Sequence, residues 1–178
     1  FGFTKPISIN FPSSAFGYMN IKESVNDKEL ASLGYGYGIT ISPFQIASAY
    51  SVFANEGILK DFKLLKNQEV TSKQIISSET ANHILDALRM VVKDGTGKAA
   101  NINGFSEGGK TGTVHQIKRG SGYAEDSYRA SFIGIAPLNT ESLTIFISID
   151  EPGLNSYSGG AVAAPVFAKI AESSLNYL

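Results

Sequence analysis

Alternation of apolar and polar residues predicts three strands in the second half of the chain, at about 105–117, 129–136 and 142–150. In the last of them Leu143, Ile145, Ile147 and Ile149 are separated by Thr144, Phe146 and Ser148. A period of two is typical of a strand with one richer apolar face. The links between these stretches are short, and the polar, Gly-rich residues 118–127 predict a hairpin loop. The pattern therefore predicts an antiparallel sheet of at least three strands.

Helical patterns lie before and after these strands. Ser42, Pro43 and Gln45 form a capping-box start for a helix that ends near Asn55. A second helix begins at Ser77 or Ser78 and ends at Gly95, and a third runs over 163–175. Residues 1–34 show no lasting period and are expected to be irregular. The fold class predicted is α+β, an antiparallel sheet covered by helices.

Composition narrows the class of protein. The 178 residues suit one domain, and 43% hydrophobic with 17% charged residues is ordinary for a globular protein. A net charge of -1 gives no support to a nucleic-acid partner, and zero cysteines exclude disulfides and thiolate metal sites. No metal or cofactor is expected. No apolar run is long enough for a membrane span, and the chain starts at Phe1 without a signal peptide, so we expect a piece of something longer.

The most informative stretch is Gly104-Phe105-Ser106-Glu107-Gly108-Gly109-Lys110-Thr111-Gly112-Thr113, which fits two motifs. Residues 104–111 match the phosphate loop G-x-x-x-x-G-K-[ST], and residues 110–112 match the K-T-G of penicillin-binding proteins and serine β-lactamases. A phosphate loop leaves a buried strand and enters a helix. Here the residues before the motif are polar and interrupted by glycines, and the residues after it have the pattern of a strand. The flanks therefore favour K-T-G and leave a nucleotide-binding protein as a remote alternative.

Several further motifs occur together with K-T-G. They are Gly36-Tyr37-Gly38 leading into Ser42-Pro43-x-Gln45, Gly95-Thr96-Gly97-Lys98-Ala99-Ala100, Gly122-Tyr123-Ala124, residues 130–137, Asp150-Glu151-Pro152, and Tyr157 with residues 159–167. In this order they resemble the transpeptidase domain of class B penicillin-binding proteins, more closely the septal, cell-division type. The resemblance covers most of the chain.

Two catalytic motifs of that family are missing. The family acylates a serine in Ser-x-x-Lys, and no serine here has a lysine three residues later. The second motif, Ser-x-Asn, is fitted only formally at Ser8, Ser24 and Ser174, which we interpret as accidental. Residues 5–12 instead resemble a later segment of the family. We therefore expect residues 1–178 to be the C-terminal portion of one transpeptidase domain, with the nucleophile in an upstream part outside this chain.

On a strand, Thr111 and Thr113 point to one side and Lys110 to the other, and Gly112 leaves the surface open for a peptide added at the edge. The resemblance implies the D-Ala-D-Ala stem peptide of peptidoglycan, or a β-lactam, as ligand. It implies that the hydroxyls of Thr111 and Thr113 bind the terminal carboxylate. It also implies that Lys110 adds positive charge and that the Thr113 N–H is one of two oxyanion donors.

Aromatic residues are candidates for a wall of the binding cleft. The first candidates are Tyr37 and Tyr157, and the second are Tyr35 and Tyr123. Ser158 stands where some relatives carry a second aromatic residue. His115 shares the strand parity of Thr113, but the family uses no base at that position.

The resemblance implies a parent enzyme that cross-links septal peptidoglycan by acyl transfer through a serine ester. It would lie at the periplasmic face of the bacterial inner membrane, anchored outside this chain, with division-complex membrane proteins as partners. The present polypeptide alone is expected to be inactive. An alternative with the same K-T-G is a non-catalytic domain that senses β-lactams or peptidoglycan.

Overall fold

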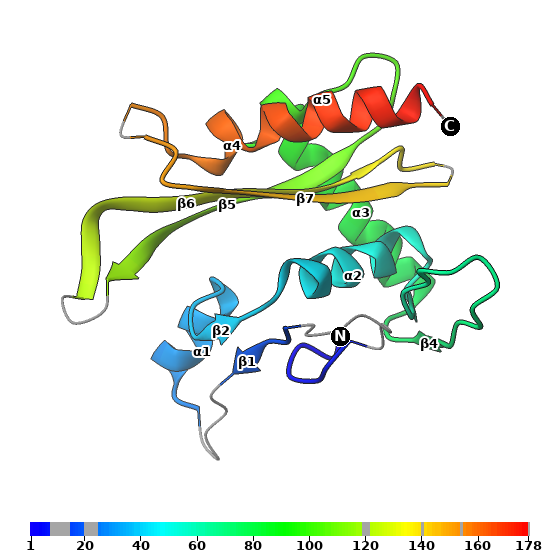
Figure 1. Ribbon diagram of the computed structural model, residues 1–178, viewed down its shortest axis with the longest axis horizontal. Coiled ribbons are helices and arrows are strands. Elements are labelled where there is room, and N and C mark those ends of the chain that lie inside the picture. Colours follow the sequence, from blue (N-terminus) through cyan, green and yellow to red (C-terminus); the bar gives the residue numbers. More distant parts are fainter. Residues whose placement is uncertain (8–14, 20–24, 119–121, 140, 154, 178) are drawn as a thin grey trace.

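An antiparallel sheet forms the centre of the molecule (Figure 1). The computed structural model describes residues 1–7, 15–19, 25–118, 122–139, 141–153 and 155–177, with side chains at all of these except 117, 118 and 122–126. The sheet has the order β5-β6-β7, formed by β5 (Gly108–Lys118), β6 (Gly122–Ala136) and β7 (Leu143–Asp150). The predicted antiparallel sheet is confirmed, and β5 is at its edge in the described part of the chain.

Helices cover this sheet, as the sequence predicts, and they lie on both of its faces. Figure 1 shows α4 (Gly159–Val162) and α5 (Ala164–Leu175) over one face and α2 (Pro43–Ala54) over the other. The longest helix, α3 (Ser78–Lys93), packs against β5. A short 3-10 turn, η1 (Lys98–Ala100), follows it. The fold is α+β, and no described helix is long and apolar enough to cross a membrane.

The core lies between β6 and α5. Phe132 and Phe167 are fully buried, and their ring centroids are 5.0 Å apart. Ile102 and Ala136 belong to the same buried cluster. Two glycines permit this close packing, because a methyl group at Gly109 would overlap the ring of Phe132 and one at Gly134 would overlap both rings. The strand that carries the K-T-G motif is therefore fixed against the core at its first residues.

The predicted capping box of α2 is confirmed. The backbone N–H of Gln45 donates to Ser42 Oγ at 3.3 Å, and the backbone N–H of Ser42 donates to Gln45 Oε1 at 3.1 Å. Gln45 is only 4% exposed, and its Nε2 also donates to the carbonyl oxygens of Phe3 at 2.7 Å and Lys5 at 3.2 Å. One buried side chain therefore both starts α2 and holds the first residues of the chain.

Two parts of the sequence prediction were wrong. Residues 1–34 are not irregular throughout, because α1 (Asp27–Gly34) follows an Asn26–Glu29 capping box and β1 (Tyr18–Met19) pairs with β2 (Ile39–Thr40). Helix α1 is only eight residues long and buries none of its residues. A second small hairpin pairs β3 (Ile58–Lys60) with β4 (Ser72–Gln74).

The second error is the hairpin loop predicted over 118–127, where β5 continues to Lys118 and β6 already begins at Gly122. Strand β7 pairs with β6 only from Arg129 onward. Residues 122–128 consequently pair with β5 alone and form a two-stranded ribbon beyond the sheet. Such a ribbon has no third strand beside it, which accounts for its polar composition.

Candidate active site

The Lys-Thr-Gly-Thr motif lies within β5, and no helix follows it. Lys110 pairs with Ile133 and Thr113 with Ala130 in the antiparallel register with β6. A phosphate loop requires a helix N-terminus directly after the Gly-Lys-Thr sequence. Because residues 108–118 are a strand, the nucleotide-binding alternative for Gly104–Thr111 is wrong.

Lys110 and the two threonines point to opposite faces of β5. The Lys110 side chain is exposed, and its Nζ donates to the carbonyl oxygen of Thr111 at 2.8 Å. Gly108, two residues earlier and on the same face, lies against Leu88 of α3. The cation and the hydroxyls therefore flank the strand from two sides, as the strand parity predicts.

Both threonine hydroxyls have a partner in a distant segment. The hydroxyl of Thr111 lies 2.8 Å from that of Thr96, in the turn after α3. The backbone N–H of Gly159 donates to Thr113 Oγ1 at 3.1 Å. Gly159 is 46 residues from Thr113, at the start of α4. Two distant segments therefore meet at the K-T-G strand.

The strand surface at Gly112 is not open, contrary to expectation. On one face, a methyl group at Gly112 would lie 2.5 Å from Ser131 Oγ. On the other face Gly159 packs so closely that a methyl group on it would overlap the Ser131 carbonyl oxygen and lie 2.6 Å from that of Gly112. The chain itself occupies both faces at this position, and the free edge of β5 is what remains for a ligand.

A row of aromatic rings continues from this point. The rings of Tyr128 and Tyr157 are stacked, with centroids 4.2 Å apart at 21°, and His115 lies 4.4 Å from Tyr128 at 50°. Tyr128 pairs with His115 across β5 and β6, so it shares the face of Thr113. Sequence reasoning missed Tyr128, because its place beside His115 and Tyr157 depends on the strand register and on a contact between distant segments. We call these three rings the aromatic row.

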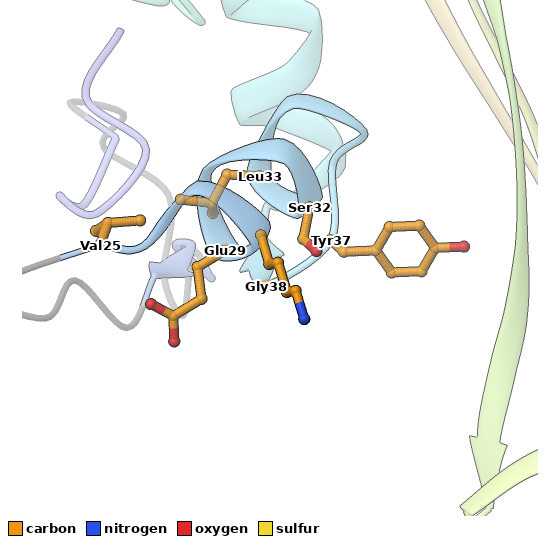
Figure 2. A pocket seen from close by; sticks show the side chains of 7 residues that line it. Val25, Glu29, Ser32, Leu33, Tyr37 and Gly38 are labelled. Atoms are coloured by element: carbon orange, nitrogen blue, oxygen red, sulfur yellow. The ribbon is translucent and has the colours of Figure 1, made fainter.

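The tyrosines expected to form a wall do not come together. Tyr37 lines a cavity of about 330 Å³ beside α1, with Val25, Ser32 and Leu33 among its neighbours, and Figure 2 shows its ring pointing away from that helix. No ring contact joins Tyr37 to Tyr157 in the described part of the chain. Tyr35 is 84% exposed, and the side chain of Tyr123 lies outside the described residues. Ser158 caps α4 through the Ala161 N–H.

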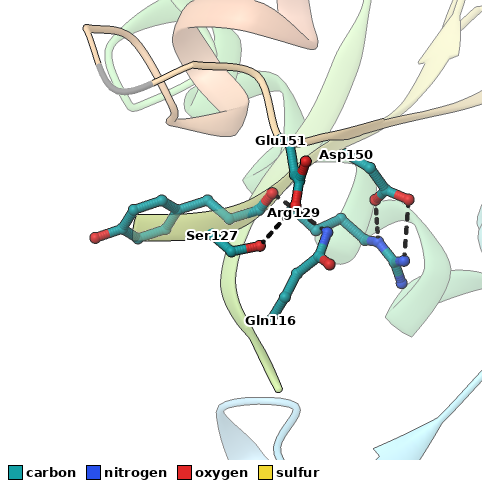
Figure 3. Close-up of polar contacts among 6 residues, drawn as sticks. Gln116, Ser127, Arg129, Asp150 and Glu151 are labelled. Carbon is teal, nitrogen blue, oxygen red and sulfur yellow. Dashed lines mark hydrogen bonds and ion pairs between the residues drawn. The ribbon is translucent and has the colours of Figure 1, made fainter. Parts of the chain in front are cut away.

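A second cavity, of about 470 Å³, lies beside β5 just beyond Thr113. It is lined by residues 39–41 on one side and by Val114, His115, Gln116 and Arg129 on the other. Arg129 forms a two-point ion pair with Asp150, in which Nη2 donates to Oδ2 at 3.2 Å (Figure 3). Hydrogen bonding from Arg129 lowers the pKa of the Asp150 carboxyl group. The pair is half-exposed and adds charge at the rim of the cavity.

Figure 3 also shows how the neighbouring side chains are tied together. Gln116 Nε2 donates to the carbonyl oxygen of Tyr128 at 3.4 Å, and Ser127 Oγ donates to Glu151 Oε1 at 3.2 Å. These bonds connect β5, β6 and the end of β7 at the point where the ribbon leaves the sheet. The frame behind the aromatic row is therefore cross-linked by polar contacts.

A buried carboxyl group precedes the motif, and sequence reasoning missed it. Glu107 is 4% exposed, and its Oε2 has no hydrogen-bond partner among the described residues. Burial raises the pKa of this carboxyl group, and a backbone hydrogen bond at Ile102 and the charge of Arg89 act against that rise. A lone acidic residue between Ser106 and Gly108 carries no sequence signal of burial.

The fold and the K-T-G strand together define the class of protein to which the chain belongs. An α+β domain with helices on both faces of an antiparallel sheet and a Lys-Thr-Gly-Thr edge strand is the architecture that the resemblance predicted. A family model described as the penicillin binding protein transpeptidase domain matches residues 1–172. The chain belongs to this family, and the predicted resemblance is confirmed.

Three relatives show how much of each protein the chain covers. The probable peptidoglycan D,D-transpeptidase PbpC of Pseudomonas aeruginosa is 37% identical over 179 residues, which cover 99% of this chain and 32% of PbpC. Stage V sporulation protein D of Bacillus subtilis is 36% identical over 188 residues, 98% of this chain and 29% of that protein. The apo transpeptidase domain of Burkholderia pseudomallei penicillin-binding protein 3 superimposes with a TM-score of 0.85 at 34% identity, covering 99% of this chain and 54% of that one. The chain thus spans about a third of the length of these curated relatives.

Proposed function

We propose that the protein to which this chain belongs is a serine-type peptidoglycan D,D-transpeptidase that β-lactams inhibit. The observation that carries the proposal is the edge strand β5, which presents Lys110 on one face and the hydroxyls of Thr111 and Thr113 on the other. An extended peptide can add to such an edge through main-chain hydrogen bonds. Two hydroxyls and one cation beside that edge suit a peptide that ends in a carboxylate.

Each residue then has a separate task. The hydroxyls of Thr111 and Thr113 bind the carboxylate of the terminal D-Ala, and Lys110 adds positive charge for it. The backbone N–H of Thr113 donates to the oxyanion that forms during acyl transfer, a contribution of about 3 kcal/mol in other acyl-transfer enzymes. The cavity between residues 39–41 and Val114–Gln116 lies further along the same strand and offers room for the rest of the stem peptide.

The nucleophile comes from a part of the protein outside residues 1–178. Its serine oxygen attacks the carbonyl carbon between the two D-Ala residues, the C–N bond breaks, and the proton passes to the amine of the departing D-Ala. The amine of a second stem peptide then attacks the serine ester and releases the serine with its proton. A β-lactam undergoes the same attack, and the ring nitrogen takes the proton while the acyl group stays on the serine.

The role in the cell follows from the substrate. Peptidoglycan lies outside the inner membrane, so we place the domain in the periplasm, on a protein anchored by a segment outside this chain. The match of residues 122–136 and 159–167 to the septal type favours cross-linking during cell division, together with membrane proteins of the division complex. A sensing domain of the same fold differs only in that it is acylated without turning over peptide.

Labelling with a fluorescent penicillin tests these proposals. We expect a labelled band for the intact protein and none for a polypeptide of residues 1–178 alone, because the latter contains no Ser-x-x-Lys. A labelled 178-residue band would show that a serine of this chain is the nucleophile. Release of D-Ala from a pentapeptide by the intact protein separates the enzyme from the sensor, and acylation without release would favour the sensor.

A further inference from the structure

We propose that Gly159 is a positioning residue for the Thr113 hydroxyl, and that the aromatic row of His115, Tyr128 and Tyr157 holds Gly159 in place. This inference rests on the proposed function, because it concerns how Thr113 recognises a carboxylate. It assigns a role to the 157–160 loop and to two side chains, His115 and Tyr128, that the proposed reaction leaves unused.

The direction of one hydrogen bond decides the orientation of the hydroxyl. A threonine hydroxyl has one proton to donate and lone pairs with which it accepts. The Gly159 N–H donates to Thr113 Oγ1 at 3.1 Å and so occupies one accepting position. The proton of the hydroxyl must then point elsewhere, and a carboxylate, which only accepts, is the ligand that this orientation suits.

Only a glycine fits where this amide lies. A Cβ atom at Gly159 would overlap the carbonyl oxygen of Ser131 and lie within 3.1 Å of the backbone nitrogen of Gly112. At Gly160 a Cβ atom would overlap the carbonyl oxygen of Thr96 and lie 3.5 Å from Thr111 Cγ2. The two glycines therefore sit on the strand between the side chains of Thr111 and Thr113, and a side chain there would lift the loop away.

The aromatic row holds the same loop from the side. Tyr157 is two residues before Gly159, and its ring stacks on Tyr128 of β6, which in turn contacts His115 of β5. Ser158, between them, accepts the Ala161 N–H and fixes the turn into α4. The rings join the loop to the two strands that carry Thr113 and its register partner Ala130, so the loop and the hydroxyl keep a constant relative position.

The test compares a carboxylate ligand with its ester. We would measure acylation of the intact protein by benzylpenicillin and by benzylpenicillin methyl ester, for the wild type and for Gly159→Ala and Tyr128→Ala. The matched control is Gly34→Ala, because a methyl group at Gly34 meets no atom within 4 Å. We expect each of the two site variants to lose about tenfold in acylation by the acid, the size of one hydrogen bond to a charged group, and clearly less with the ester.

The same two variants made in a Thr113→Val background test whether they act through the Thr113 hydroxyl. With the hydroxyl gone, Gly159→Ala and Tyr128→Ala should cause little further loss with either ligand. Equal losses with acid and ester, or equal losses with and without the Thr113 hydroxyl, would overturn this inference and leave the proposed function standing. If Gly159→Ala fails to fold, Tyr128→Ala alone decides, since it leaves the glycine contacts intact. A wild-type protein that no penicillin acylates would overturn the proposed function and this inference with it.

Discussion

The hydroxyl oxygens of Thr96 and Thr111 lie 2.8 Å apart and connect the turn that follows α3 to the K-T-G strand. Thr96 stands in the Gly-Thr-Gly turn over 95–97, and its carbonyl oxygen lies so close to Gly160 of α4 that a Cβ atom there would overlap it. The Gly-Thr-Gly turn thus has a physical task. It supplies the partner that Thr111 needs while no ligand is present.

Replacing Thr96 by valine should slow acylation without unfolding the protein. Valine keeps the branched shape and leaves the backbone contact to Gly160, but Thr111 loses the partner that holds its hydroxyl. The loss of one neutral hydrogen bond corresponds to a decrease of about two- to tenfold in the acylation rate. Rates from stopped-flow measurements with a chromogenic cephalosporin would show it, with exposed Thr4→Val as the control. A variant that acylates at the wild-type rate would show that Thr96 does not orient Thr111.

Lys110→Ala should slow acylation more than Thr113→Val. Both changes remove a contact to the ligand carboxylate, but Lys110→Ala also removes a full positive charge beside it, whereas Thr113→Val removes only a hydroxyl donor. We expect a loss of about a hundredfold for Lys110→Ala and about tenfold for Thr113→Val, whose backbone N–H stays in place. Acylation by Lys110→Ala within a factor of two of the wild type would contradict the role of Lys110.

Much of the fold could be predicted because local patterns and tertiary structure agree. The alternation in 142–150 and the capping box at Ser42 both appear as expected, in β7 and α2. Helix α1 was missed because it is only eight residues long, so that an apolar period scarcely repeats within it. Its Asn26–Glu29 capping box was the available signal. The ribbon over 115–118 and 122–128 was missed because it has no third strand beside it. Its polar sequence therefore shows no alternation of apolar and polar residues.

Of the site, only the features that depend on local sequence could be predicted. Strand parity is local, so the division of Lys110 from Thr111 and Thr113 followed from the motif alone. The contacts of Thr113 with Gly159 and of Tyr128 with Tyr157 join segments far apart in the chain. No spacing rule predicts such contacts. The same holds for Glu107, whose burial depends on the packing of residues around Ile102 and α3.

Gln45→Met should destabilise the protein and release its first residues. Methionine has a similar volume, but it cannot donate to the carbonyl oxygens of Phe3 and Lys5 or accept from the Ser42 N–H. Removing a buried hydrogen-bonding group in this way costs about 1–3 kcal/mol of unfolding free energy. Urea denaturation would measure the cost, and limited proteolysis should cut the variant earlier within residues 1–17. Gln68→Met, at an exposed bond to Leu64, is the control, and equal stability of both variants would refute the role of Gln45.

Glu107→Gln should stabilise the protein at neutral pH and not at acidic pH. Burial raises the folded-state pKa of Glu107 above its unfolded value of about 4.3. A carboxyl group with a raised folded pKa contributes stability below its unfolded pKa, and this contribution is lost as the pH rises through the folded value. As the pH rises above the unfolded pKa, the wild-type protein therefore loses stability, because the buried site disfavours the ionised carboxylate, and glutamine removes that penalty.

The size and the pH dependence of this effect separate it from a simple change in packing. We expect Glu107→Gln to raise the unfolding free energy by about 1 kcal/mol at pH 7, and the difference to disappear near pH 4. Arg89→Gln should act in the opposite direction at pH 7, because the charge of Arg89 favours the ionised form of Glu107. Chemical denaturation of both variants between pH 4 and pH 8, with the exposed Glu69→Gln as reference, provides the measurement. A stability difference that stays constant over this range would mean that Glu107 has the same pKa in the folded and the unfolded protein, and the assignment of a raised pKa would be wrong.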